Sequence, residues 1–126
     1  MIKFTIPLIP VTKKNSMQVS VRNGKPNVRQ SKHYLQYESD CLKLITGRYK
    51  LNINYPVNIK ATYYMPTQRR VDLINLHSAL HDILVKAHVL EDDNCKIVVS
   101  TDGSRVLYDK EHPRTEIEIS ELLMGG

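Results

Sequence analysis

The chain has 126 residues, 41% of them hydrophobic and 25% charged, which is enough for one domain with a real core. No run approaches the roughly 20 apolar residues of a membrane helix, and the N-terminus does not resemble a signal peptide, so the cytoplasm is the expected location. The net charge of +5 favours a polyanionic partner such as nucleic acid, although a solvated basic face explains the charge alone equally well.

The charge is unevenly distributed along the chain. Residues 1–37 contain no Asp or Glu, whereas acidic residues concentrate from Asp72 onward. The basic residues of the first quarter are Lys3, Lys13, Lys14, Arg22, Lys25, Arg29 and Lys32. A basic arm followed by an acidic centre suits an enzyme that holds phosphates electrostatically and a metal ion by carboxylates.

The N-terminal segment predicts a strand and a hairpin. Residues 2–9 alternate imperfectly between apolar and polar side chains and predict a strand that ends at Pro10. Residues 17–22 alternate again, and the turn signal Asn23-Gly24 leads to a return strand near 27–29.

A helix is predicted next. Ser31 is a suitable N-cap, and the apolar spacing continues to about Thr46, where Gly47 ends the helix. Tyr34 and Tyr37 lie on this spacing, which favours packing in the core over stacking on nucleic acid bases.

The central segment predicts a strand followed by an amphipathic helix. Residues 56–65 predict the strand, which ends at Pro66. The helix follows over residues 73–88, and its apolar positions are Leu73, Leu76, Leu80, Ile83, Leu84 and Ala87. Asp72 precedes the first turn, where an aspartate acts more often as an N-cap than as a metal ligand.

The C-terminal third predicts strands. Residues 95–100 are rich in β-formers, Asp102-Gly103 predicts a hairpin turn into residues 105–108, and residues 115–120 alternate as a last strand. The complete order predicts a single α+β domain over residues 1–126, in which mixed β-sheet and hairpins pack against two main helices.

Two other patterns have simple explanations. Cys41 and Cys95 have no metal-ligand spacing and are expected to be reduced and packed. His77 and His81 have a spacing that can hold Zn²⁺, but no third ligand is near in sequence, so solvent exposure is the favoured interpretation. Asp82 is expected to pair with Lys86 as readily as to take part in chemistry.

Metal-dependent cleavage of a phosphodiester needs hard oxygen ligands, usually from Asp or Glu. Asp72 at a strand–helix junction and Asp93 at the entry to the next strand are suitable positions. Arg69 and Arg70, directly before Asp72, are suited to pairing with a phosphate.

The central pattern resembles the RusA family of Holliday-junction resolvases, small homodimeric endodeoxyribonucleases that are often encoded by phages or prophages. The resemblance covers roughly residues 2 to 120. It rests on an R-R-x-D-x-x-N segment, a further Asp in the following helix, and a hydrophobic-acid-D-D segment before a strand. The matching residues are Arg70, Asp72, Asn75, Asp82, Asp92 and Asp93.

The resemblance implies a homodimer that uses Mg²⁺, or Mn²⁺, to cut four-way junction DNA in recombination and repair. Asp72 and Asp93 would be metal ligands and catalytic residues, Asp92 an auxiliary ligand, and Asn75 an orienting group. The expected DNA-binding residues are Arg69, Arg70, Lys13, Lys14 and Lys32.

The sequence departs from the family pattern at two positions. Family members carry D-x-D-N, but here Ile74 stands where the second aspartate is expected, and isoleucine cannot bind a metal. Ser78 stands where a lysine is often found. The alternative is therefore a catalytically impaired homologue that binds DNA structures, and a protein-interaction module without a DNA role is a third hypothesis.

Overall fold

The structure, a computed structural model, describes residues 1–13, 17–22 and 25–123. Its centre is a five-stranded mixed sheet in which β1 and β4 both pair antiparallel with β7, while β5 and β6 both pair parallel with β4. The strands are β1 (Ile2–Ile6), β4 (Val57–Met65), β5 (Val98–Ser100), β6 (Arg105–Tyr108) and β7 (Arg114–Glu121).

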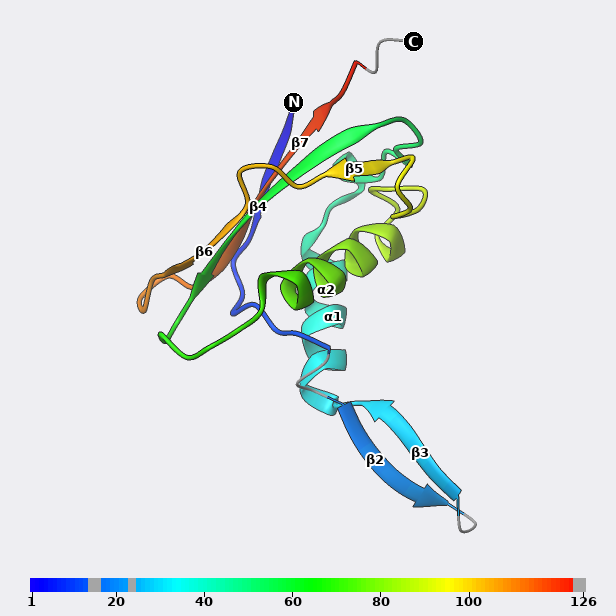
Figure 1. The fold of residues 1–126 in the computed structure, drawn as a ribbon, viewed down its shortest axis with the longest axis vertical. Coiled ribbons are helices and arrows are strands. Elements are labelled where there is room, and N and C mark those ends of the chain that lie inside the picture. The colour runs from blue at the N-terminus through cyan, green and yellow to red at the C-terminus, as the bar shows by residue number, and fades with distance from the viewer. Residues whose placement is uncertain (14–16, 23–24, 124–126) are drawn as a thin grey trace.

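Two helices, α1 (Lys32–Leu44) and α2 (Leu73–Lys86), cover one face of this sheet (Figure 1). The strands alternate accordingly, because a sheet covered on one side buries every second residue. In β4 the buried positions are Val57, Ile59, Ala61 and Tyr63. The predicted α+β fold with two main helices is thus confirmed.

The cap predicted for the first helix is also confirmed. The side chain of Ser31 accepts a hydrogen bond from the backbone N–H of Tyr34 at 3.1 Å, and this satisfies one donor of the first turn. Tyr34 and Tyr37 are buried, as their spacing predicted. A short 3₁₀ turn over Gly47–Tyr49 follows the helix.

A separate two-stranded ribbon is formed by β2 (Met17–Arg22) and β3 (Lys25–Gln30), which pair antiparallel. It extends away from the sheet at the N-terminal end of α1 (Figure 1). The predicted hairpin strands are therefore confirmed, and the turn predicted at 23–24 lies outside the described residues.

Three expectations about local structure were wrong. β5 and β6 do not form a hairpin, because both pair with β4 at successive positions, and the turn at Gly103 (φ 87°) only carries the chain between them. β1 ends at Ile6, ahead of Pro7. Cys95 is exposed, although Cys41 is buried as expected.

In the part of the chain that the structure describes, neither helix is long and apolar enough to cross a membrane.

Candidate active site

Asp72 occupies the residue before α2, and its side chain is exposed. It takes the N-cap position but makes no side-chain capping hydrogen bond to the first turn. Instead the amide Nδ2 of Asn75 donates to Asp72 Oδ2 at 3.2 Å. The carboxylate is thus oriented by Asn75 and remains open to solvent, which is the condition of a group available to a ligand.

Asp92 and Asp93 lie in the exposed segment 91–94, here called the acidic loop. The Asp92 carboxylate accepts hydrogen bonds from Asp93 N at 2.8 Å and from Asn94 Nδ2 at 2.9 Å. These bonds, that from Asn94 first, lower the pKa of Asp92. Asp92 therefore braces the loop, while the Asp93 carboxylate has no hydrogen-bond partner among the described residues.

One chain does not bring Asp72 and Asp93 together. Helix α2 has 14 residues, so its two ends are about 20 Å apart. Asp72 lies at one end, and the acidic loop follows the other end (Figure 1).

The backbone anchors of the acidic loop confirm this placement. Glu91 N donates to Ile53 O at 2.9 Å, and Val57 N donates to Ile97 O at 2.8 Å, so the loop is held at the beginning of β4. Asp72 follows the end of β4. Within the described ranges, no group of three or more His, Cys, Asp or Glu side chains is placed to hold a metal ion. A single chain therefore does not fit a cation site shared by Asp72 and Asp93.

Arg69 and Arg70 line a cavity of about 480 Å³ next to Asp72, here called the arginine pocket. Both arginines are exposed, and within the described residues neither side chain forms an ion pair or a hydrogen bond. The other lining residues are Ile9, Pro10, Val11, Thr12, His33, Met65, Pro66, Thr67 and Val71. With two uncommitted guanidinium groups and no lining carboxylate, the pocket is suited to an anion.

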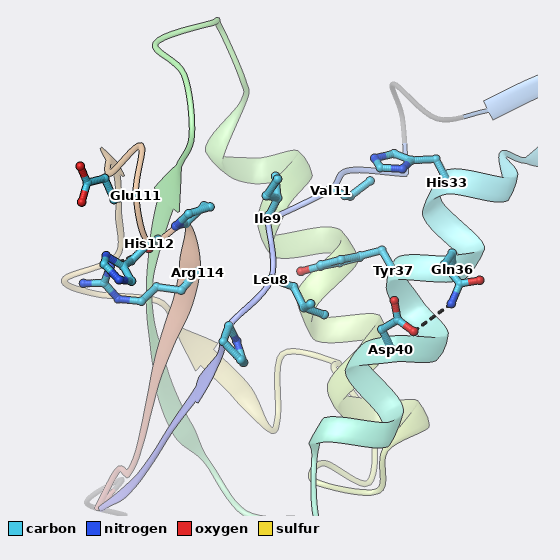
Figure 2. Close-up of a pocket in the computed structure, with 12 residues that line it drawn as sticks. Leu8, Ile9, Val11, His33, Gln36, Tyr37, Asp40, Glu111, His112 and Arg114 are labelled. Carbon is cyan, nitrogen blue, oxygen red and sulfur yellow. Dashed lines mark hydrogen bonds between the residues drawn. The ribbon is translucent and has the colours of Figure 1, made fainter.

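A larger cavity of about 550 Å³ is lined by the segment that contains Leu8 and Ile9, by α1 and by residues 111–114 (Figure 2). Figure 2 shows Tyr37 and Asp40 on α1 facing this segment, with Glu111 and Arg114 beyond it. Two carboxylates line this cavity, and Arg114 is paired with Asp109 at 2.8 Å. It is thus less suited to a phosphate than the arginine pocket is.

The predicted basic contacts divide into different environments. Lys13 Nζ lies 2.6 Å from Asp82 Oδ2, so this lysine joins the N-terminal segment to α2. Lys32 is exposed at the beginning of α1, and Lys14 lies outside the described residues.

Asp82 has a structural role in the same cluster of charges. Lys86 is 3.5 Å from Asp82, as its i,i+4 spacing predicted, and also 2.9 Å from Glu38 on α1. Partial burial opposes ionisation of Asp82, but hydrogen bonds and charge from Lys13 and Lys86 prevail and lower the pKa of its carboxyl group. Asp82 thus joins the N-terminal segment to α2, and Lys86 extends the cluster to Glu38 on α1.

The expectation for the two histidines was wrong. His77 is buried, and its Nδ1 is 2.7 Å from the hydroxyl oxygen of Tyr63. The His81 ring stacks on the His77 ring at a centroid distance of 5.4 Å. The Nε2 atoms of both rings are buried without a hydrogen-bond partner in the described part of the chain. The side of α2 that packs against the protein therefore includes His77 as well as the apolar positions that the sequence predicted.

Ile74 is 80% exposed on the first turn of α2, close in sequence to Asp72. An exposed isoleucine contributes little to the core, so packing does not explain this residue. The position faces solvent, where a carboxylate would have been accommodated without change to the fold.

Comparison with known proteins gives one finding. The family model described as Endodeoxyribonuclease RusA matches residues 7–120, which include both aspartates, both arginines and all of α2. A search of curated proteins finds no match to the chain.

Proposed function

Because the chain belongs to the RusA endodeoxyribonuclease family, we propose that it is a Mg²⁺-dependent endonuclease, with Mn²⁺ as an alternative metal. Its substrate would be the four-way DNA junction, cut by paired symmetric nicks during recombination or repair. The observation that carries this proposal is the exposed Asp72, held by Asn75 directly beside the arginine pocket.

The separation of the two aspartates makes a homodimer part of the proposal. In a symmetric dimer each protomer contributes the same surface to the interface. If the two copies of α2 lie side by side there, with the twofold axis perpendicular to the helices, they run antiparallel. The N-terminal end of one helix then lies near the C-terminal end of the other. Asp72 of one protomer and Asp93 of its partner would form each site.

The residues have separate roles in this proposal. A divalent cation held by the two aspartates would supply the charge that stabilises the scissile phosphate and activates water. Arg69 and Arg70 would hold a DNA phosphate beside the carboxylate. Asn75 would keep the Asp72 oxygens in one orientation, and Asp92 would keep the acidic loop in shape, with a possible auxiliary contact to the cation.

Mixing two inactive variants tests the proposal. Asp72→Asn and Asp93→Asn are each expected to leave a labelled four-way junction intact in Mg²⁺. Mixed dimers would contain one site with both aspartates, so single nicks should return without paired cleavage. If the mixture of the two variants stays inactive, both aspartates of a site belong to one chain, and the two-chain site is refuted. Intact junctions with the unmodified protein at high enzyme and metal would refute the nuclease itself.

A second candidate function is favoured by Ile74. With an isoleucine in place of the family's second aspartate, the site has fewer oxygen ligands for a cation. A homologue that binds junctions without cutting them would retain the arginine pocket and have no use for this carboxylate. Binding without cleavage in Mg²⁺ and in Mn²⁺ would favour this candidate.

A further inference from the structure

We propose that the arginine pocket takes up one unpaired nucleotide of the DNA, with the base against its apolar wall and the adjoining phosphate on its arginines. This inference rests on the proposed action on DNA junctions and specifies which part of the junction the protein recognises.

The apolar wall is the first support. It consists of Ile9, Met65, Pro66 and Val71, all of them accessible to some degree, and Ile9 is 50% exposed. A site for a backbone phosphate alone needs only donors and positive charge. A nucleic acid base, by contrast, is flat and apolar on its faces, and proteins that bind unpaired bases pack apolar, aromatic or guanidinium groups against those faces.

The polar lining is the second support. Arg69, Arg70 and His33 can donate to a phosphate or stack on a base, and Thr12 and Thr67 offer hydroxyl groups. No Asp or Glu lines the pocket. The combination of basic, hydroxyl and apolar groups matches three features of a nucleotide: the phosphate, the polar edge of the base and the apolar faces of the base.

The size and place of the pocket are the third support. About 480 Å³ lies within the range of sites that enclose small molecules, whereas a stacked duplex keeps its bases inside the helix, where they cannot enter such a recess. Base pairs at the branch point of a junction lack one stacking neighbour, so swinging out a base costs least there. Val71 of the pocket adjoins Asp72, which places the unpaired nucleotide beside the proposed point of cleavage.

The test uses a four-way junction carrying 2-aminopurine at the branch point, in EDTA so that no cleavage occurs. The fluorescence of this base rises when it leaves the stack. Binding of the unmodified protein should raise it severalfold, and the same label in the middle of a duplex arm should show no rise.

Filling the pocket provides the matched variants. Ile9→Trp places a larger side chain at the wall and should abolish the fluorescence rise, lowering junction affinity about tenfold relative to duplex affinity. Leu35→Trp is the control, because Leu35 is also half-exposed, at 49%, but does not line the pocket. It should behave as the unmodified protein.

The outcomes separate this inference from the proposed function. A fluorescence rise lost in Ile9→Trp supports the pocket even if the junction is never cut in Mg²⁺. Cleavage without any rise, or equal effects of Ile9→Trp on junction and duplex, would refute the pocket and leave the nuclease standing. In that case the arginines bind only the phosphates of paired DNA.

Discussion

At the scale of single residues, Ile74 is the position at which the two proposed functions, a nuclease and a protein that binds junctions without cutting them, can be told apart. The side chain points to solvent at the N-terminal end of α2, so its replacement changes the chemistry of the site without disturbing the core.

We expect Ile74→Asp to raise the rate of junction cleavage tenfold or more, because a second carboxylate near Asp72 adds an oxygen ligand for the cation. Single-turnover cleavage of a labelled junction in Mg²⁺ measures the change. Ile74→Asn is the control, since it removes the apolar side chain without adding charge. An unchanged rate in Ile74→Asp would mean that the other ligands suffice.

His81 shows how a partly buried residue with a buried ring nitrogen connects pH to stability. Burial lowers the pKa of His81 to about 4, and the neighbouring His77 adds a smaller lowering effect. Burial also lowers the pKa of His77. In the unfolded chain a histidine titrates near 6.5, so between these two values the unfolded state binds more protons than the folded state. Stability therefore falls as the pH is lowered from about 6.5 toward about 4.

We expect His81→Leu to reduce this acid sensitivity, with a difference on the order of 3 kcal/mol in the free energy of unfolding between pH 7 and pH 4. Urea unfolding at a series of pH values measures it. Parallel pH profiles for His81→Leu and the unmodified protein would contradict the neutral state of His81 in the folded protein.

At the scale of elements, the β2–β3 ribbon contains much of the basic charge of the N-terminal quarter. Its strands include Arg22, Lys25 and Arg29, and a two-stranded ribbon has the dimensions to enter the major groove of DNA. The ribbon extends away from the sheet (Figure 1). In the proposed function it would contact a DNA arm.

Changing Arg22, Lys25 and Arg29 together to Gln should weaken junction binding and reduce the slope of log affinity against log salt by about 2 to 3. Fluorescence anisotropy between low and moderate salt measures this slope. A variant with Lys43, Lys50 and Lys110 changed to Gln has the same net charge, with all three changes at exposed positions outside the ribbon. Equal slopes in the two variants would show that only total charge matters.

The elements also show which local signals are reliable. The two helices were predicted closely because each combines a polar residue at the N-cap position with a long apolar repeat. The Asp102-Gly103 signal predicted the turn correctly but predicted the wrong strand pairing. The same turn residues serve whether β6 pairs with β5 or with β4. β4 offers its free edge along nine residues, and both short strands pair there.

At the scale of the whole molecule, the proposed site depends on two chains. If each site needs Asp72 from one protomer and Asp93 from its partner, cleavage per chain should fall steeply at concentrations where the dimer dissociates. Cleavage rates across a dilution series, compared with the dimer fraction from sedimentation, measure this. Cleavage per chain that stays constant among monomers would contradict the two-chain site.

The sequence by itself determined the α+β class, the two helices, the Ser31 cap, the family likeness, and the position of Asp72 beside two arginines. These features are local, because capping, apolar periodicity and adjacent charges act over a few residues. Only the tertiary structure decided that His77 is buried, that Lys13 is bound to Asp82, and that the fold of one chain does not bring Asp72 and Asp93 together. Such facts depend on which distant segments of the chain meet in the fold. Asp72 and Asp93 belong to one sequence motif, but the rigid helix between them keeps the two side chains apart.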